Sequence, residues 1–150
     1  MPLGLRLALG TLWIMYSDGP APRQLTRDEC MRYMASVPVG RIIYTRQALP
    51  AVELVSFAID DGDIVIRTDH NGKLAAATRG AVVAFEADSL DTEFQAGWSV
   101  TAIGPSHDVT DEDETSRLAQ IGLGSWAAGE PEHFMRISPG IINGRRLSVP

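Results

Sequence analysis

The sequence contains almost no lysine. It has 13 lysine and arginine residues in 150, and Lys73 is the only lysine among them. A coding bias towards arginine would explain this ratio, and so would a need for an ammonium group at position 73, so the composition leaves both explanations open. The chain also has a single cysteine, Cys30, which excludes an internal disulfide and a zinc site built from several cysteines.

The chain lacks both an excess of positive charge and a long hydrophobic run. Its formal net charge is −6, and we expect no nucleic-acid partner because neutralising phosphates requires a basic surface. The apolar stretch at residues 7–16 is too short to cross a bilayer. A signal peptide is the alternative for this stretch, but no small-residue cleavage site follows it, so we expect a cytoplasmic protein that does not contact membranes.

A chain of this length predicts one domain with a substantial core. The composition is 45% hydrophobic and 21% charged, which is typical of a globular protein. The segment after residue 16, SDGPAPRQ, resembles a linker. We therefore expect residues 1–24 to be an N-terminal extension, either disordered or preceding a true start at Met15, and residues 25–150 to form the folded domain.

The hydrophobic pattern predicts one helix followed mostly by strands. Thr26 and Glu29 have capping-box spacing, and Pro38 ends the helix that they begin, with Cys30 on its apolar face. Beyond Pro38 the pattern predicts strands at 39–45, 52–59 and 64–68, a short helix at 71–79, strands at 81–86 and 98–103, an acidic helix from 110 towards 121, and strands at 134–137 and 141–147.

The strand spacing predicts the fold class. Asp61-Gly62 between two apolar runs is a strong hairpin signal, because a tight turn needs positive φ angles. Short strands joined by hairpins favour an antiparallel sheet. We expect a mainly β (α+β) fold, in which about six strands form a small antiparallel barrel with peripheral helices.

Several familiar site motifs can be set aside. The glycine-rich run at 122–127 superficially matches a dinucleotide fingerprint, but it follows a helix and not a strand. The acidic run at 110–114 lacks the spacing and the glycine of a calcium loop. His70, His107 and His133 are far apart in the sequence, so we expect no metal site.

The segment at 67–74, RTDHNGKL, has the chemistry of a phosphate site. Arg67 offers a planar set of donors, Thr68 a hydroxyl and Lys73 a compact charge. Asn71 can cap the helix that follows, and Gly72 allows a close approach to its first N–H groups. A surface turn in which Arg67 pairs with a neighbouring aspartate is the alternative, and the residues alone leave both interpretations open.

A series of segments in a fixed order identifies a family. They are the helix LTRDECMRYM, the strand VGRI, and then DDGDIVIRTDHNGKLAAA, FEAD, GWSVTAIG and NGRR. In this order they resemble the pyridoxamine 5′-phosphate oxidase-like family of flavin-binding split β-barrels, and in particular its short actinobacterial-type members. The resemblance covers residues 24–147. It implies FMN as the cofactor, with Arg67, Thr68 and Lys73 at its phosphate and Asn71 and Gly72 in the intervening turn.

The resemblance also implies how the flavin ring is placed. Leu54, Val55 and Ser56 would run along the ring and offer mainly main-chain groups, and Trp98 and Ser99 would lie near the flavin, across a dimer interface. A barrel of about six strands is filled by its own side chains, so a flat ring must lie outside it. A homodimer with the cofactor at the interface is the expected arrangement.

The resemblance implies an FMN-binding oxidoreductase-like protein that transfers hydride or electrons to or from a small molecule. A non-catalytic flavin-binding module and a deazaflavin-dependent reductase are the alternatives. The polyanionic tail of a deazaflavin calls for a broad basic groove, which one lysine and a net charge of −6 disfavour. True pyridoxamine phosphate oxidases carry a C-terminal Arg/His substrate motif, and this chain has no histidine after His133. We therefore do not expect vitamin B6 oxidation, and we expect Arg145 and Arg146 to cap the last strand rather than to bind phosphate.

Overall fold

The structure is a computed structural model that describes residues 22–68, 73–93, 95–123 and 133–147. The expected N-terminal extension therefore lies almost wholly outside the described residues. The elements are β1 (Arg23–Gln24), α2 (Arg27–Met34), β2 (Val39–Arg46), β3 (Leu49–Asp60), β4 (Asp63–Thr68), α3 (Lys73–Thr78), β5 (Val82–Asp91), β6 (Ala96–Asp108), α4 (Glu112–Ala119), β7 (His133–Ile137) and β8 (Ile141–Leu147).

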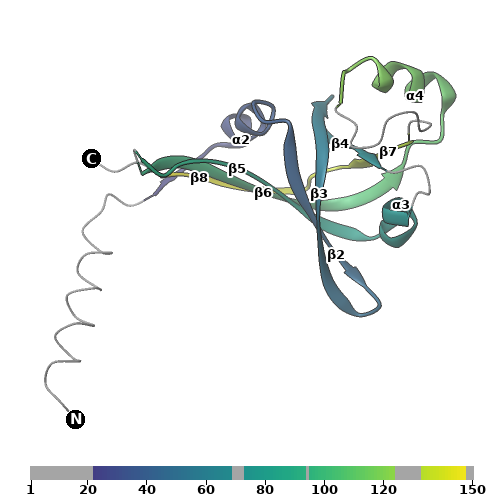
Figure 1. Cartoon of the computed structure of the whole chain (residues 1–150), viewed down its shortest axis with the longest axis horizontal. Helices are drawn as coiled ribbons and strands as arrows, with labels where there is room; N and C mark the ends of the chain where they lie inside the picture. Colours follow the sequence, from purple (N-terminus) through teal and green to yellow (C-terminus); the bar gives the residue numbers. More distant parts are fainter. Residues whose placement is uncertain (1–21, 69–72, 94, 124–132, 148–150) are drawn as a thin grey trace, which may run out of the picture.

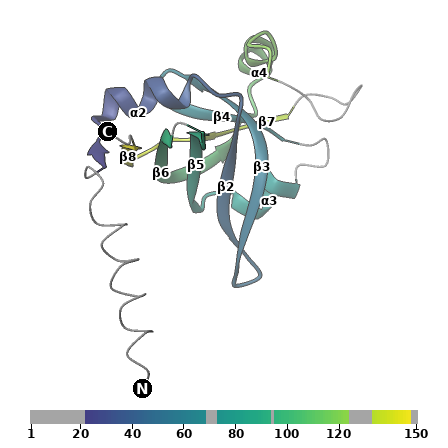
Figure 2. The ribbon, with the colours of Figure 1, turned by 60° about the vertical axis from the view of Figure 1, so that its left-hand side comes forward.

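Six antiparallel strands close into a barrel (Figures 1 and 2). Around the barrel the neighbours are β6, β5, β2, β3, β4 and β7, and β7 pairs back onto the far end of β6. Strands β8 and β1 continue the sheet beyond the near part of β6. The predicted fold class, a small antiparallel split barrel with peripheral helices, is confirmed.

The elements follow the predicted order, but several are longer than the sequence pattern indicates. The β3–β4 hairpin turns at Asp61 and Gly62 with φ angles of 51° and 80°, as predicted for a tight turn. Strands β5 and β6 pair from Val82 with Pro105 to Asp91 with Ala96, well beyond the predicted runs. Strand β1, which pairs with the end of β8, is an element that the hydrophobic pattern did not indicate.

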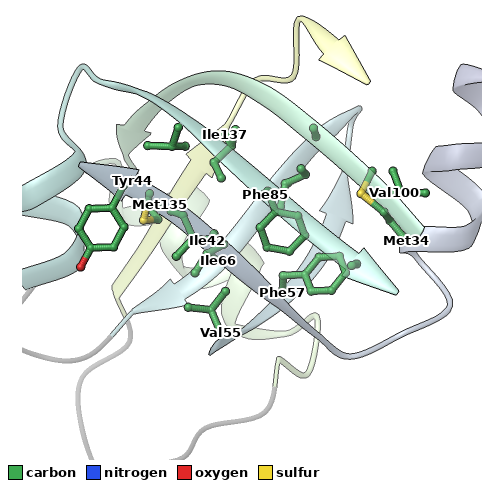
Figure 3. Packing of buried hydrophobic residues seen from close by; sticks show 14 of the residues in the cluster. Met34, Ile42, Tyr44, Val55, Phe57, Ile66, Phe85, Val100, Met135 and Ile137 are labelled. Atoms are coloured by element: carbon green, nitrogen blue, oxygen red, sulfur yellow. The ribbon is translucent and has the colours of Figure 1, made fainter. Parts of the chain in front are cut away.

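The interior of the barrel is filled by its own side chains (Figure 3). Ile42, Phe57, Ile66 and Phe85 are almost wholly buried, and the two phenylalanine rings contact each other with centroids 4.7 Å apart. Side chains on a strand alternate between its two faces, so the intervening residues point outwards. A planar ligand therefore has to bind on the outside of the barrel.

In the described part of the chain, three helices cover the barrel. Helix α2 begins with the predicted capping box of Thr26 and Glu29, and it buries Cys30 against the sheet. Burial raises the pKa of the Cys30 thiol, which fits the predicted core role rather than a nucleophile. Helix α3 buries Leu74 at one end of the barrel, and α4 packs on the outside of β4 and β7. No helix in the described part of the chain is long and apolar enough to span a bilayer.

Candidate functional site

Strands β3 and β4 separate halfway along β3, and this opening carries most of the predicted site residues. Over residues 49–56, β3 pairs with β2, whereas it pairs with β4 only from Phe57 to Asp60. Along its other edge, β4 pairs with β7 from Ile64 to Thr68, so its last two residues, Arg67 and Thr68, pair with β7 but not with β3. Within the described ranges, no strand pairs with the second edge of β3 over residues 49–56.

This second edge of β3, residues 49–56, presents main-chain donors and acceptors, and we call it the open edge. The N–H of Phe57 donates to the carbonyl oxygen of Pro38, on the β2 side, at 3.2 Å. Because successive peptide groups point to alternate edges of a strand, those of Ser56 and Leu54 face the open edge. The side chain of Val55 points into the core. The main-chain role predicted for this strand therefore has a geometric basis.

Arg67 and Thr68 leave the end of β4 on opposite faces of the sheet. Arg67 donates through Nη1 to the carbonyl oxygen of Leu123, 3.0 Å away, in the segment after α4. The hydroxyl of Thr68 donates to the carbonyl oxygen of His133, 3.3 Å away on β7. Arg67 and Thr68 come next after Ile66 on β4. Ile66 pairs with Phe57 of β3, which comes next after Ser56. The structure thus brings Ser56, Arg67 and Thr68 together at the opening.

Lys73 is exposed and opens α3, five residues after Thr68. The predicted turn residues Asn71 and Gly72 lie outside the described residues. Helix α3 has only six residues, so we assign affinity for an anion here to side chains and not to a helix dipole. Arg67, Thr68 and Lys73 together supply guanidinium, hydroxyl and ammonium donors, which is a suitable donor set for a phosphate ester.

Trp98 and Ser99 lie on β6, which is separated from β3 by β5 and β2 within one chain. The Trp98 side chain is only 7% exposed and packs against Tyr33 of α2, with the ring centroids 5.2 Å apart. Ser99, on the opposite face, is paired with Asp88. The intervening strands are in register, with Ser99 opposite Asp88 of β5, and with Arg41 of β2 opposite both Glu86 of β5 and Leu54 of β3. The predicted approach of Trp98 and Ser99 to a flavin stays a prediction.

Two further features near the opening were not among the predicted site residues. The hydroxyl of Tyr44 donates to a carboxylate oxygen of Glu53 on the part of β3 that carries the open edge. Burial, followed by this hydrogen bond, raises the pKa of Tyr44. His133, set aside as an isolated histidine, is directly opposite Thr68 in the β4–β7 pairing. Alternation along β2 could have placed Tyr44 inside the barrel, but only the tertiary fold brings His133 to Thr68.

Two other predicted features can be placed. Arg146 lies 3.4 Å from the Tyr33 hydroxyl, to which it donates, so it ties the last strand to α2. Among the described residues, no group of three histidine, cysteine, aspartate or glutamate side chains gathers as a metal site would require.

Known proteins resemble this chain over most of its length. The family model described as pyridoxamine 5′-phosphate oxidase matches residues 26–146. An uncharacterized protein of Mycobacterium tuberculosis is 38% identical over 129 residues, which span 83% of this chain and 84% of that protein.

Solved structures agree with this match. An FAD binding protein from Mycobacterium smegmatis is 29% identical, with a TM-score of 0.72 over 86% of this chain and 99% of its own. A candidate pyridoxamine 5′-phosphate oxidase from Corynebacterium glutamicum is 28% identical, with a TM-score of 0.76 over 86% of this chain and 95% of its own. Together with the family model, these matches show that the chain belongs to the pyridoxamine 5′-phosphate oxidase family.

Proposed function

We propose that this protein binds a flavin nucleotide at the opening between β3 and β4 and uses it for redox chemistry on a small molecule. The observation that carries the proposal is the separation of the two strands, which leaves the open edge of β3 beside Arg67 and Thr68. The M. smegmatis relative, 29% identical over nearly its whole length, is an FAD binding protein, which supports a flavin as the ligand class.

The polar tail of the flavin fits the end of β4. Arg67 and Lys73 carry the positive charges that a phosphate ester needs. The Thr68 hydroxyl donates to the carbonyl oxygen of His133 in the structure, and it becomes a donor to the phosphate when it rotates away from that oxygen. Arg67 donates to the carbonyl oxygen of Leu123, and this bond orients its guanidinium, a planar group with five N–H donors. We take FMN as the first candidate because this donor set matches a single phosphate.

The flavin ring fits along the open edge of β3. The N–H and C=O groups of Leu54 and Ser56 face that edge, and the ring system of a flavin carries complementary acceptors and donors on its pyrimidine side. Leu54 is more than half exposed, so its side chain offers apolar surface next to these polar groups. Residues of β3 thus bind and orient the ring, while Val55 fixes the strand to the core.

A second copy of the chain fits over the neighbouring face of the sheet. Val52, Ile43, Ala84, Ile103 and Ile141 are consecutive register partners across five strands, and we call them the apolar stripe. They point away from the barrel interior, and the larger side chains at its two ends, Val52 and Ile141, are more than half exposed. A continuous apolar row of this kind is typical of an interaction surface.

The neighbouring row supplies a polar rim to the apolar stripe. Arg41 donates to Glu86 at 2.9 Å and to Asp88 at 3.1 Å on the same outward face. An apolar centre with a charged rim is the usual anatomy of a protein interface. We propose a homodimer through this face, which is the arrangement that would let Ser99 of a second chain approach the flavin.

When bound, a flavin supplies hydride and electron transfer between small molecules, and the protein supplies binding, orientation and electrostatics. A non-catalytic flavin carrier is the second candidate. FAD is the second candidate ligand, favoured by the M. smegmatis relative.

Ligand-free protein titrated with FMN, FAD and riboflavin tests the proposal, with flavin fluorescence as the readout. We expect saturable binding of one flavin per chain and tighter binding of FMN than of riboflavin. Reducing the loaded protein without oxygen and then adding oxygen, a quinone or a nitroaromatic separates the two functions. Reoxidation faster than that of free FMN supports the oxidoreductase, whereas a rate no faster than that of free FMN supports the carrier.

A further inference from the structure

We propose that His133 is an additional flavin-binding residue, which donates a hydrogen bond from its Nε2 atom to the phosphate of the cofactor. The inference rests on the proposed function, because it adds a residue to the same site. The ring of His133 has a buried nitrogen without a hydrogen-bond partner in the part of the chain that the structure describes.

His133 occupies the place on β7 that faces the end of β4. It is the register partner of Thr68, and its carbonyl oxygen accepts from the Thr68 hydroxyl at 3.3 Å. Directly opposite residues of an antiparallel pair project from the same face, with Cβ atoms roughly 5 Å apart. The imidazole and the Thr68 hydroxyl are therefore neighbours at the end of β4, where the phosphate is proposed to bind.

The Nε2 atom of His133 is buried and has no hydrogen-bond partner among the described residues. Buried polar atoms nearly always have one, because losing the hydrogen bonds to water without replacement is unfavourable. Nε2 can be a donor in the neutral ring and always is one in the charged ring. A phosphate oxygen adjacent to Thr68 would satisfy this atom and would gain a donor from it.

One other buried atom in the described residues, Oδ1 of Asp108, also lacks a partner. Asp108 is opposite Met135 on β7, two residues from His133, and its other oxygen accepts from Arg79 at 2.9 Å. A carboxylate oxygen only accepts hydrogen bonds, so it cannot contact a phosphate favourably. Arg79 balances the negative charge of Asp108. Of the two atoms, Nε2 of His133 is therefore the one that suits an anion.

Three variants test the assignment by flavin affinity. His133→Leu removes the ring nitrogen, and His133→Gln keeps a polar atom at a similar distance from the main chain. His107→Leu is the matched control, because His107 is exposed on β6, where it pairs with Arg136 away from the opening. Each variant is titrated with FMN and with riboflavin, which lacks the phosphate, and the unfolding temperature of each ligand-free protein is measured.

We expect His133→Leu to weaken FMN binding by about tenfold, which is typical for losing a hydrogen bond to a charged group, and to leave riboflavin binding unchanged. His133→Gln should recover most of the loss, and His107→Leu should bind as the wild type does. The ligand-free His133→Leu protein should unfold no lower than the wild type, because the change removes an unpartnered buried nitrogen.

Two results would overturn the assignment. One is an unchanged affinity of His133→Leu for FMN, and the other is an equal loss for FMN and riboflavin, which would mean that the phosphate is not the partner. Both presuppose that the wild type binds flavin. If the wild type binds neither FMN nor FAD, the proposed function itself fails, and the His133 assignment fails with it.

Discussion

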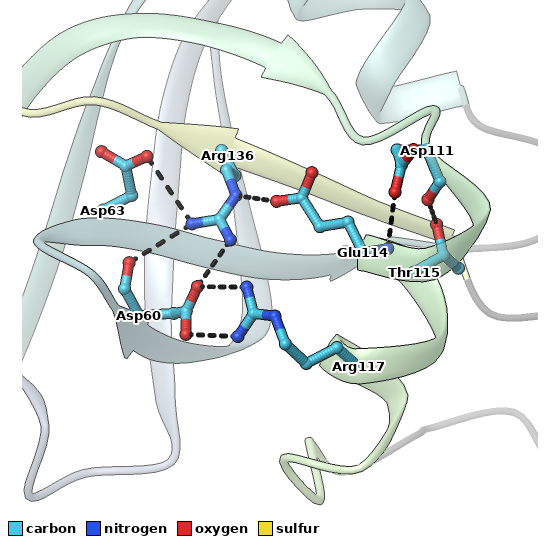
Figure 4. Close-up of polar contacts among 7 residues, drawn as sticks. All are labelled: Asp60, Asp63, Asp111, Glu114, Thr115, Arg117 and Arg136. Carbon is cyan, nitrogen blue, oxygen red and sulfur yellow. Dashed lines mark hydrogen bonds and ion pairs between the residues drawn. The ribbon is translucent and has the colours of Figure 1, made fainter.

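Arg136 on β7 donates to the carboxylate of Asp60 on β3 at 2.5 Å, across the outside of the barrel (Figure 4). The same guanidinium reaches Glu114 of α4 at 2.6 Å, and Arg117 of α4 binds Asp60 with both of its terminal nitrogens. This cluster fastens α4 to the β3–β4 hairpin. The segment after α4 contains Leu123, whose carbonyl oxygen accepts from Arg67, so the cluster also steadies one side of the proposed site.

The Asp60 cluster predicts a loss of stability in acid. Hydrogen bonds from Arg117 and Arg136 hold the pKa of Asp60 well below its usual range. A carboxyl group with a depressed folded-state pKa stabilises the protein above its unfolded-state pKa, near 4, and loses that contribution as the pH falls further. Asp60→Asn should therefore lower the free energy of unfolding by about 2 kcal/mol at pH 7, and by progressively less below pH 4.

Urea unfolding of wild type and variant at neutral and acid pH measures this difference. Asp61→Asn is the control, because Asp61 is the exposed neighbour in the turn, and asparagine tolerates its positive φ of 51°. A difference between wild type and Asp60→Asn that stays constant with pH would contradict the ion-pair account.

The close packing of α2 on the sheet predicts that one added methyl group lowers the stability of the protein. A Cβ atom at Gly144 of β8 would lie 2.5 Å from the Sγ atom of Cys30 and 3.0 Å from Val100. Overpacking of this kind costs about 1–3 kcal/mol, so Gly144→Ala should lower the unfolding free energy by that amount. Gly140→Ala is the control, since a Cβ atom there would lie 3.9 Å from its nearest neighbour, the carbonyl oxygen of Ile103. Equal stability of the two variants in thermal unfolding would show that α2 is not held in this way.

The proposed phosphate site predicts that replacing Lys73, the only lysine, weakens the binding of FMN but not of riboflavin. Lys73→Ala should weaken FMN binding by ten- to a hundredfold, which is the range of about 1–3 kcal/mol for a charge-assisted hydrogen bond, while riboflavin binding stays the same. Arg32→Ala removes an equal charge from an exposed position on α2 and should bind FMN normally. Calorimetric titration measures both, and an equal FMN affinity of Lys73→Ala and wild type would remove the lysine from the site.

The apolar stripe predicts a dimer that a single charge disrupts. Ile103→Asp places a carboxylate within the stripe and Ile141→Asp places one at its end, and either variant should sediment as a monomer where the wild type is a dimer. Ile121→Asp is the control, because Ile121 is similarly exposed but follows α4, away from the stripe. Analytical ultracentrifugation gives the masses. A wild-type monomer, or a dimer in all three variants, would contradict the proposed interface.

The fold was largely readable from the sequence because its signals are local. The Thr26–Glu29 capping box and the Asp61-Gly62 turn each depend on residues a few positions apart, and both are present as predicted. The ends of the strands were harder to predict from the sequence. The polar residues Asp88 and Ser89 belong to β5 because they pair with Ser99 and Trp98 of β6, and their own residue types do not indicate a strand.

The site was readable only in part for the same physical reason. Arg67, Thr68 and Lys73 follow one another in the chain, so their shared chemistry was visible in the sequence. His133 reaches Thr68 through strand pairing across 65 residues, and nothing local marks it. The ion pair of Arg136 with Asp60, across 76 residues, escaped prediction because an arginine in an apolar run does not reveal its distant partner.

Titration of the ligand-free wild-type protein with FMN tests the central claim most directly. We expect saturation at one FMN per chain. Riboflavin should bind more weakly than FMN, because it lacks the phosphate and therefore the contacts that the phosphate makes. No binding of either FMN or FAD at concentrations that saturate a flavoprotein would contradict it.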